Sequence, residues 1–91
     1  RFNKTLDDMI QDIQDLLEEI EEVKEDIEYE KEKMESNKLL YETGRMSKIE
    51  YDTLQDKITL LENDLKELEL DLNMKYAELL IYSDLKKVVK D

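Results

Sequence analysis

The chain contains one point at which a helix is expected to stop, because its only Gly is Gly44 and there is no Pro. A left-handed residue closes many helices, and Gly has no Cβ to oppose that conformation. Just after it, Ser47 and Glu50 have the spacing of a capping box, and Met46 and Tyr51 have the spacing of a hydrophobic staple. A stop signal and a start signal therefore lie next to each other. The sequence predicts two long helices joined by one specified turn.

On each side of this turn, apolar residues recur every seven positions in two rows offset by three. This spacing is typical of a coiled-coil seam, which supercoils because a repeat of about 3.5 residues falls short of the roughly 3.6 residues per turn of a straight helix. Before the turn, the rows are Leu6, Ile13, Ile20, Ile27, Met34 and Tyr41, and Met9, Leu16, Val23, Glu30 and Asn37. After the turn, they are Tyr51, Ile58, Leu65, Leu72 and Leu79, and Leu54, Leu61, Leu68, Lys75, Tyr82 and Val89.

The two seams share one antiparallel register. Folding the chain about the turn pairs Tyr41 with Tyr51 near the tip, and the same operation pairs Val23 with Leu68 along the shaft. In every pair the two residue numbers sum to 91 or 92, so the register needs no slip from the tip to the ends. We therefore predict an all-α fold in which two long antiparallel helices form a coiled-coil hairpin. Residues 1–91 are expected to be a single hairpin, with a helix over 3–43, a turn over 44–46 and a helix over 47–89.

Polar side chains interrupt the apolar rows at three positions, each paired with an aliphatic residue. Such interruptions fix the register at some cost in stability. Long polar side chains at these positions are expected to carry their charges out to water along their apolar stems. The pairs are Glu30 with Leu61, Asn37 with Leu54, and Lys75 with Leu16.

Composition argues against enzyme chemistry. Cys and His are both absent, which removes thiol nucleophiles, zinc-finger ligand sets and the usual general base near neutral pH. The many pairs of Asp and Glu at helical spacing are typical of a solvated helix face, and none has the pattern of a calcium loop. A two-helix hairpin also lacks the concave pocket that a small molecule needs. We therefore expect no enzyme, and no catalytic, metal-ligating or cofactor-binding residues.

The net charge of −12 is unevenly distributed along the chain. Acids crowd residues 18–35, whereas Lys38, Arg45 and Lys48 surround the turn. A surface this negative repels phosphates, so neither nucleic acid nor an anionic membrane is expected as a partner. A protein partner is expected at the tip instead. The candidate binding residues there are Gly44, Arg45, Met46, Ser47 and Lys48.

The half of the hairpin far from the turn has more apolar residues than one seam requires. A helix that is apolar on several sides needs neighbours on several sides. We therefore expect this open end to pack against further protein, either as a homo-oligomer or within the rest of a parent protein. The chain begins at Arg1 rather than Met, which favours an excised fragment. The extra apolar residues are Ile10, Leu17, Leu60, Leu70, Met74, Ala77, Leu80, Ile81, Leu85 and Val88.

The segment 38–51, Lys-Leu-Leu-Tyr-Glu-Thr-Gly-Arg-Met-Ser-Lys-Ile-Glu-Tyr, resembles the periplasmic-tip segment of outer-membrane efflux channels of the TolC type. That family's repeat is similar to Tyr-Glu-x-Gly-x-x-Ser-x-x-Glu-Tyr followed by Leu or Ala at coiled-coil spacing, and the likeness covers residues 13–85. The resemblance implies an arm of a trimeric channel located in the cell envelope or periplasm. Its tip, at Gly44, Arg45, Met46 and Ser47, would then meet the hairpin tip of a partner adaptor protein.

Two other interpretations stay open. The pattern Gly-x-x-Ser-x-x-Glu-Tyr-Asp also suits the hairpin of a periplasmic adaptor (membrane fusion) protein, whose tip pattern is matched by Leu40 and Ser47. An unrelated coiled-coil spacer or scaffold is the third interpretation. The full-length parent separates them: a channel should contain a second related hairpin and amphipathic strands, an adaptor should contain two lipoyl halves, and a scaffold should contain neither.

Overall fold

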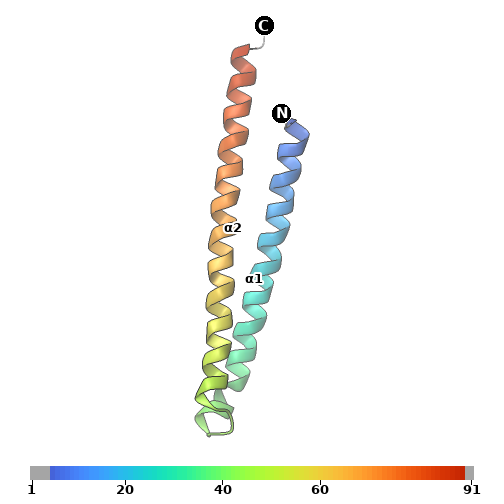
Figure 1. Cartoon of the computed structure of the whole chain (residues 1–91). Coiled ribbons are helices and arrows are strands. Elements are labelled where there is room, and N and C mark those ends of the chain that lie inside the picture. The colour runs from blue at the N-terminus through green and yellow to red at the C-terminus, as the bar shows by residue number, and fades with distance from the viewer. Residues whose placement is uncertain (1–4, 90–91) are drawn as a thin grey trace.

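The protein is a long, thin hairpin of two helices (Figure 1). The computed structural model describes residues 5–89, with side chains described as far as residue 85. Helix α1 spans Leu6–Glu42 and helix α2 spans Lys48–Val89. The molecule measures 72 × 20 × 16 Å, and α2 extends beyond the start of α1 at the open end (Figure 1). The predicted all-α hairpin is confirmed over the described residues, which contain no strand.

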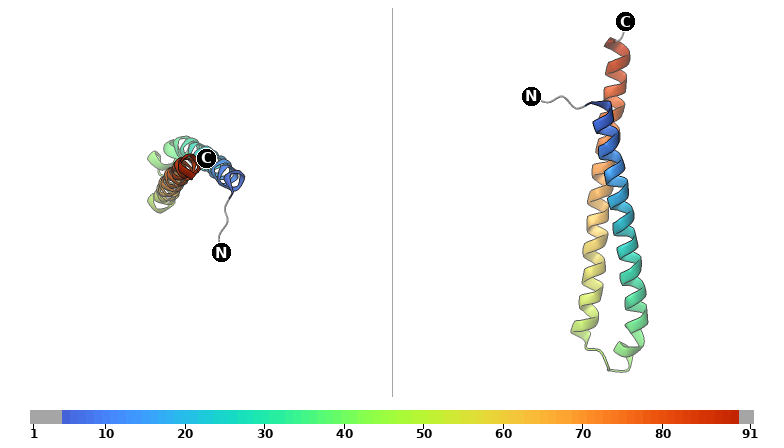
Figure 2. Two further views of the ribbon diagram at one scale, coloured as in Figure 1. Left: turned by 90° about the horizontal axis from the view of Figure 1, so that it is seen from above. Right: turned by 90° about the vertical axis from the view of Figure 1, so that its right-hand side faces the viewer.

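The two helices wind around each other. In Figure 1 they are closest in projection near the tip, whereas in the right-hand view of Figure 2, turned by 90°, they overlap toward the open end. A seam with a repeat of seven residues imposes such a course, because the apolar rows drift around each helix and must stay in contact. The antiparallel coiled coil is therefore visible in the path of the backbone.

Burial follows the predicted seam. Between residues 9 and 82 each predicted seam position is buried or half-buried, whereas Leu6 at the open end is exposed. The rings of Tyr41 and Tyr51 stack with their centroids 4.4 Å apart. Val23 and Leu68 line one groove between the helices, so the predicted register is confirmed at both pairs. The buried residues are Ile13, Leu16, Ile20, Ile27, Glu30 and Ile58.

A cap that the heptad pattern does not reveal sets the start of α1. Thr5 has extended backbone, its Oγ1 accepts a hydrogen bond from the amide of Asp8 at 3.2 Å, and Asp8 Oδ2 accepts one from the amide of Thr5 at 3.4 Å. This capping box makes Leu6 the first residue of α1, and the expected start at about residue 3 lies outside the described residues. The turn is longer than the expected 44–46, because α1 stops at residue 42 and α2 begins at residue 48.

Glu30 does not reach water, although its charge was expected to follow its stem to the surface. Only 4% of its surface is exposed. Its Oε2 lies 3.1 Å from Nζ of Lys57 on α2, while Oε1 has no hydrogen-bond partner. The Glu stem is too short to leave the seam, whereas the longer Lys stem can cross apolar surface to meet it. Lys75 behaves as expected, because its side chain is 30% exposed and its Nζ lies 3.7 Å from Glu78 Oε1.

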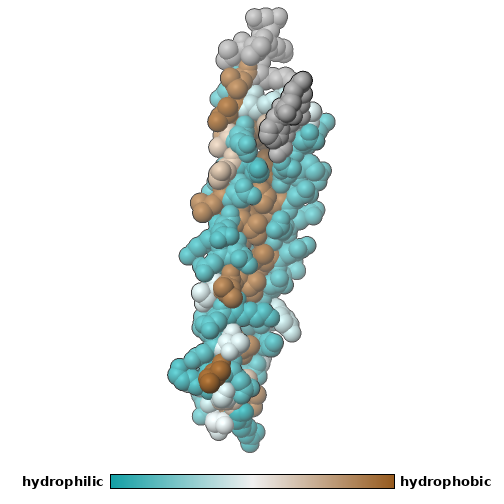
Figure 3. Space-filling view, in the orientation of Figure 1, coloured by the Kyte–Doolittle hydropathy of each residue, from teal (hydrophilic) through white to brown (hydrophobic). Residues whose placement is uncertain are grey.

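Apolar side chains also lie outside the seam, mostly on the open half. Figure 3 shows hydrophobic residues along α2 toward the open end and in the groove between the helices. Val88 and Val89 lie outside the described side chains. All the other predicted extra apolar residues are exposed, so α1 and α2 do not cover them for each other. They are Ile10, Leu17, Leu60, Leu70, Met74, Ala77, Leu80, Ile81 and Leu85.

Candidate protein-binding tip

Backbone hydrogen bonds around Gly44 close the tip. Its φ of 77° lies in the left-handed region, and no atom lies within 4 Å of the place that a Cβ would take. Gly is therefore required here by backbone conformation rather than by space. The amides of Arg45 and Met46 both donate to the carbonyl of Leu40, at 2.7 and 3.0 Å. These bonds satisfy a carbonyl that the end of α1 would otherwise leave open, and the predicted stop signal is confirmed.

The predicted capping box fixes the start of α2. The hydroxyl of Ser47 accepts a hydrogen bond from the amide of Glu50 at 3.1 Å, and Glu50 Oε1 accepts one from the amide of Ser47 at 3.3 Å. Side chains therefore satisfy two amides that the helix leaves without partners. Met46 and Tyr51 are both half-buried, as a hydrophobic staple requires, and a direct contact between them stays a prediction.

A pair of aromatic rings joins the two helices directly behind the turn. Tyr41 belongs to the last turn of α1 and Tyr51 to the first turn of α2, and their rings stack at an interplanar angle of 10°. Such a pair contributes about 0.5–1.5 kcal/mol beyond the area it buries. The stack and the two caps together hold the turn in one conformation.

The five predicted tip residues lie together between the two helices, but they differ in what they can offer a partner. Ser47 uses its hydroxyl in the cap, and Lys48 Nζ lies 2.9 Å from Asp52 Oδ2. The hydrogen bond to Asp52 and the negative charge of that carboxylate raise the pKa of Lys48 above its ordinary value of 10.5. Arg45 is exposed, and among residues 5–89 its guanidinium has no ion-pair partner. Arg45 is therefore the cation that the tip presents.

The two most exposed apolar residues near the turn are missing from the predicted site. Leu39 is 67% exposed and Ile49 is 79% exposed, and each lies five positions from Gly44 in the sequence. Neither belongs to a heptad row, so an apolar residue off the seam and beside the turn is the signal that could have identified them. An Arg with apolar neighbours is a common composition for the centre of a protein interface.

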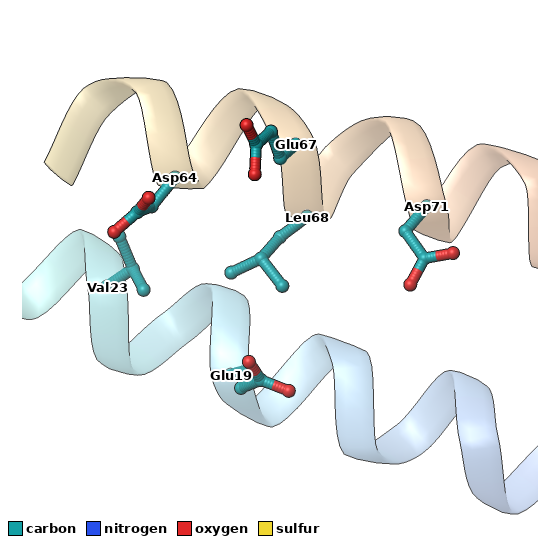
Figure 4. Close-up of a pocket in the computed structure, with 6 residues that line it drawn as sticks. All are labelled: Glu19, Val23, Asp64, Glu67, Leu68 and Asp71. Carbon is teal, nitrogen blue, oxygen red and sulfur yellow. The ribbon is translucent and has the colours of Figure 1, made fainter. Parts of the chain in front are cut away.

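The shaft offers a different surface, a shallow groove with an acidic border. Glu19 from α1 and Asp64, Glu67 and Asp71 from α2 surround the apolar pair formed by Val23 and Leu68 (Figure 4). Among residues 5–89, no group of three or more acidic side chains is placed to hold a metal ion. Neighbouring carboxylates of this kind repel one another and any acidic ligand. The groove is therefore a poor site for an acidic ligand.

Comparison with known proteins assigns no relative, because no family model, curated protein or solved structure matches the chain. Neither helix, over the residues described, has a stretch long and apolar enough to cross a bilayer. The fold defines the chain as a coiled-coil hairpin, and the assignment of a function depends on its surface. That surface has a capped tip with an exposed Arg45, an acidic shaft and an apolar open half.

Proposed function

We propose that this chain is a non-enzymatic arm of an efflux or secretion channel of the cell envelope, and that its tip docks an adaptor protein. The observation that best supports this proposal is the exposed guanidinium of Arg45, which has no ion-pair partner among residues 5–89, at a turn that Gly44 and the box of Ser47 and Glu50 hold fixed. A rigid tip favours docking, since little conformational entropy is lost when it binds. The resemblance of segment 38–51 to channel tips supports the same function.

Electrostatics favours the tip over the shaft as the docking surface. The shaft carries most of the acids of the chain, whereas Arg45 has no ion-pair partner among residues 5–89 and lies in a turn flanked in the sequence by exposed Leu39 and Ile49. Arg is enriched among the residues that dominate binding energy, particularly where apolar neighbours exclude water. Salt limits the reach of such a charge to about 8–10 Å, so Arg45 would act on groups in direct contact with the tip.

One tip offers only a small contact area. A single turn with two flanking apolar side chains falls well short of the roughly 800 Å² per partner that stable interfaces bury. Tight docking therefore requires several tips presented together, because linked copies gain affinity without new contacts. A channel with several arms around one axis would meet this requirement.

Site-specific photo-cross-linking in the organism that makes the protein tests this proposal. A cross-linking residue replaces Arg45 in one variant and Glu25, an exposed acid of the shaft, in a matched control. Cross-links to an adaptor protein from position 45 but not from position 25 are expected. Cross-links from position 45 to a channel protein would instead assign the chain as the adaptor's own hairpin. Cross-links from position 25 alone would place the binding face on the shaft and refute docking by the tip.

Reversing the charge of Arg45 provides the first prediction. Arg45→Glu is expected to abolish co-purification of the partner, because it replaces the exposed cation of the tip with an acid. The helix content measured by circular dichroism should stay unchanged, since Arg45 lies outside both helices and the seam. Glu25→Lys is the matched control on the shaft, and it is expected to leave co-purification intact.

A further inference from the structure

The side of α2 that faces away from α1 carries a second apolar row, which we call the back stripe. It consists of Leu70, Met74, Ala77 and Ile81, spaced four, three and four positions apart as in a coiled-coil seam. These heptad positions lie on the opposite side of the helix from the rows that α1 covers. Leu70 is 64% exposed, Met74 is 65% exposed and Ile81 is 60% exposed. The back stripe is therefore a complete helix-packing row that no part of the described chain occupies.

The size of this apolar patch fits one short helix. Leu80 and Leu85 flank the back stripe and are 66% and 58% exposed. A whole Leu or Ile side chain has on the order of 60–120 Å² of apolar surface, so the five large side chains together expose roughly 200–400 Å². Patches of this size on a single chain are often functional. The row is about 16 Å long, or three turns, and the small side chain of Ala77 near its middle lets another helix approach closely.

Acids frame the back stripe. One long edge has an acid at every seventh position, and an acid interrupts the row at each of its two ends. The opposite edge has a single base, Lys66, followed by Asn73. Asp71 has no ion-pair partner among the described residues, and Glu78 has only its exposed pair with Lys75, at 3.7 Å. The acids of the edge are Asp64, Asp71 and Glu78, and those of the two ends are Glu67 and Asp84.

We propose that the back stripe binds an amphipathic helix whose apolar face is flanked by Lys or Arg. Such a helix would bury the apolar row and place its cations against the acidic frame, which is the charge complementarity that favours specific association. A second copy of the chain fits less well, because each copy has a net charge of −12. In a parallel pair, Glu67 would also face its own copy, and in an antiparallel pair with Met74 opposite Ala77, Glu67 would face Asp84. This docking goes beyond the proposed function, since it uses the half of the hairpin remote from the tip.

Fluorescence anisotropy with two synthetic peptides tests the proposal on the whole chain. The first peptide is an amphipathic helix with Leu on its apolar face and Lys on both flanks, and the second has Glu in place of Lys. The Lys peptide is expected to bind, with an affinity that falls as salt rises. The Glu peptide should bind at least about tenfold more weakly. Equal binding of both peptides, or none of either, would overturn the proposal.

A pair of matched variants locates the bound peptide. Ile81→Glu is expected to lower the affinity for the Lys peptide by about tenfold or more, because it places a charge in the apolar row. Ile49→Glu makes the same change at an exposed Ile near the tip and should leave the affinity unchanged. Equal losses from both variants would show that the peptide binds the acidic surface at large and overturn the assignment.

Asp71→Lys leaves the apolar row intact, so it can locate the bound peptide even if Ile81→Glu disturbs folding. It should weaken binding of the Lys peptide several-fold and strengthen binding of the Glu peptide, because it reverses one charge of the frame. Unchanged affinities for both peptides would place the binding site elsewhere. Sedimentation of the chain alone completes the test: self-association that Ile81→Glu removes would make a second copy the occupant and refute the basic helix.

Discussion

At the tip, one residue holds a backbone conformation that no neighbouring atom enforces. Gly44 has a φ of 77°, and a Cβ there would meet nothing within 4 Å. The cost of a substitution at this position is therefore conformational, with no steric contribution from packing. That separation makes Gly44 a direct probe of how much stability the left-handed residue contributes to the turn.

Three substitutions at Gly44 are expected to rank by their tolerance of positive φ. Gly44→Ala should lower the free energy of unfolding by about 1–2 kcal/mol, and Gly44→Val should lower it further because β-branched residues are rarely found there. Gly44→Asn is the control and should cost least, since Asn enters this region more readily. Urea denaturation followed by circular dichroism measures the series. Equal midpoints for Asn and Val would mean that the turn does not depend on positive φ.

The ion pair of Lys48 and Asp52 gives a second prediction at this scale. Its hydrogen bond and its opposite charge raise the pKa of Lys48 above 10.5. A raised Lys pKa contributes stability that is fully present below the ordinary value and is lost as pH rises through the folded value. Asp52→Asn should therefore move the Lys48 titration, followed by NMR, downward toward 10.5. A titration that does not move would mean that the pair does not form in solution.

The residue signals at the tip were predictable because they are local. Gly44 and the box of Ser47 and Glu50 act through backbone groups within a few positions, so their spacing is sufficient to identify them. The box of Thr5 and Asp8 has the same spacing, but it was missed because the heptad rows do not indicate where a helix begins. Leu39 and Ile49 were missed because they lie off the rows, and only the structure reveals that nothing covers them.

At the scale of the helices, the register was predictable because it repeats along the whole seam. The course of the Glu30 side chain was not predictable from the seam, because it depends on Lys57, which lies outside the seam. Leu61 lies opposite Glu30, whereas Lys57 is one helical turn nearer the tip and reaches back to the carboxylate at 3.1 Å. A periodic pattern identifies which rows face each other, but it does not identify which long side chain can cross between them.

A double-mutant cycle at Glu30 and Lys57 tests this interaction. Lys57→Ala should lower the free energy of unfolding by about 1–3 kcal/mol, because it leaves a buried carboxylate without its partner. Glu30→Leu should be neutral or stabilising, since it replaces a buried charge with an apolar side chain at a seam position. In the Glu30→Leu background, Lys57→Ala should then lower the free energy of unfolding only slightly. Denaturant unfolding of the four variants measures the coupling, and equal costs of Lys57→Ala in both backgrounds would show that none exists.

On the scale of the whole molecule, the two ends of the rod expose different groups, a cation at the tip and apolar side chains on the open half. At the tip end, the amides of residues 43–47 are hydrogen-bonded and the exposed Arg45 has no ion-pair partner among residues 5–89, whereas the open half has its apolar back stripe uncovered. A rod 72 Å long with one seam has no thick core, so we expect its exposed apolar residues to pack against another molecule or another part of a parent protein. If the proposed function holds, we expect the two ends of the hairpin to contact different partners or different parts of one assembly.

The acidic shaft between those ends makes the stability of the hairpin depend on salt. With a net charge of −12 and four acids around one groove, the folded rod brings like charges closer than an extended chain does. Raising the ionic strength from about 0.1 M to about 1 M shortens the screening length from roughly 10 Å to 3 Å. The free energy of unfolding is therefore expected to rise with salt.

A charge reversal in the groove separates local repulsion from the effect of net charge. Glu19→Lys places a cation among Asp64, Glu67 and Asp71, and it should raise the free energy of unfolding by about 0.2–1 kcal/mol at low salt. It should also reduce the response to added salt. Glu25→Lys is the matched control, since it makes the same change in net charge at an exposed shaft position that does not line the groove. Chemical denaturation at low and high salt measures both variants. If both variants raise the free energy of unfolding equally, the salt dependence belongs to the total charge of the rod. A larger increase from Glu19→Lys would assign it to the carboxylates that the folded helices bring together.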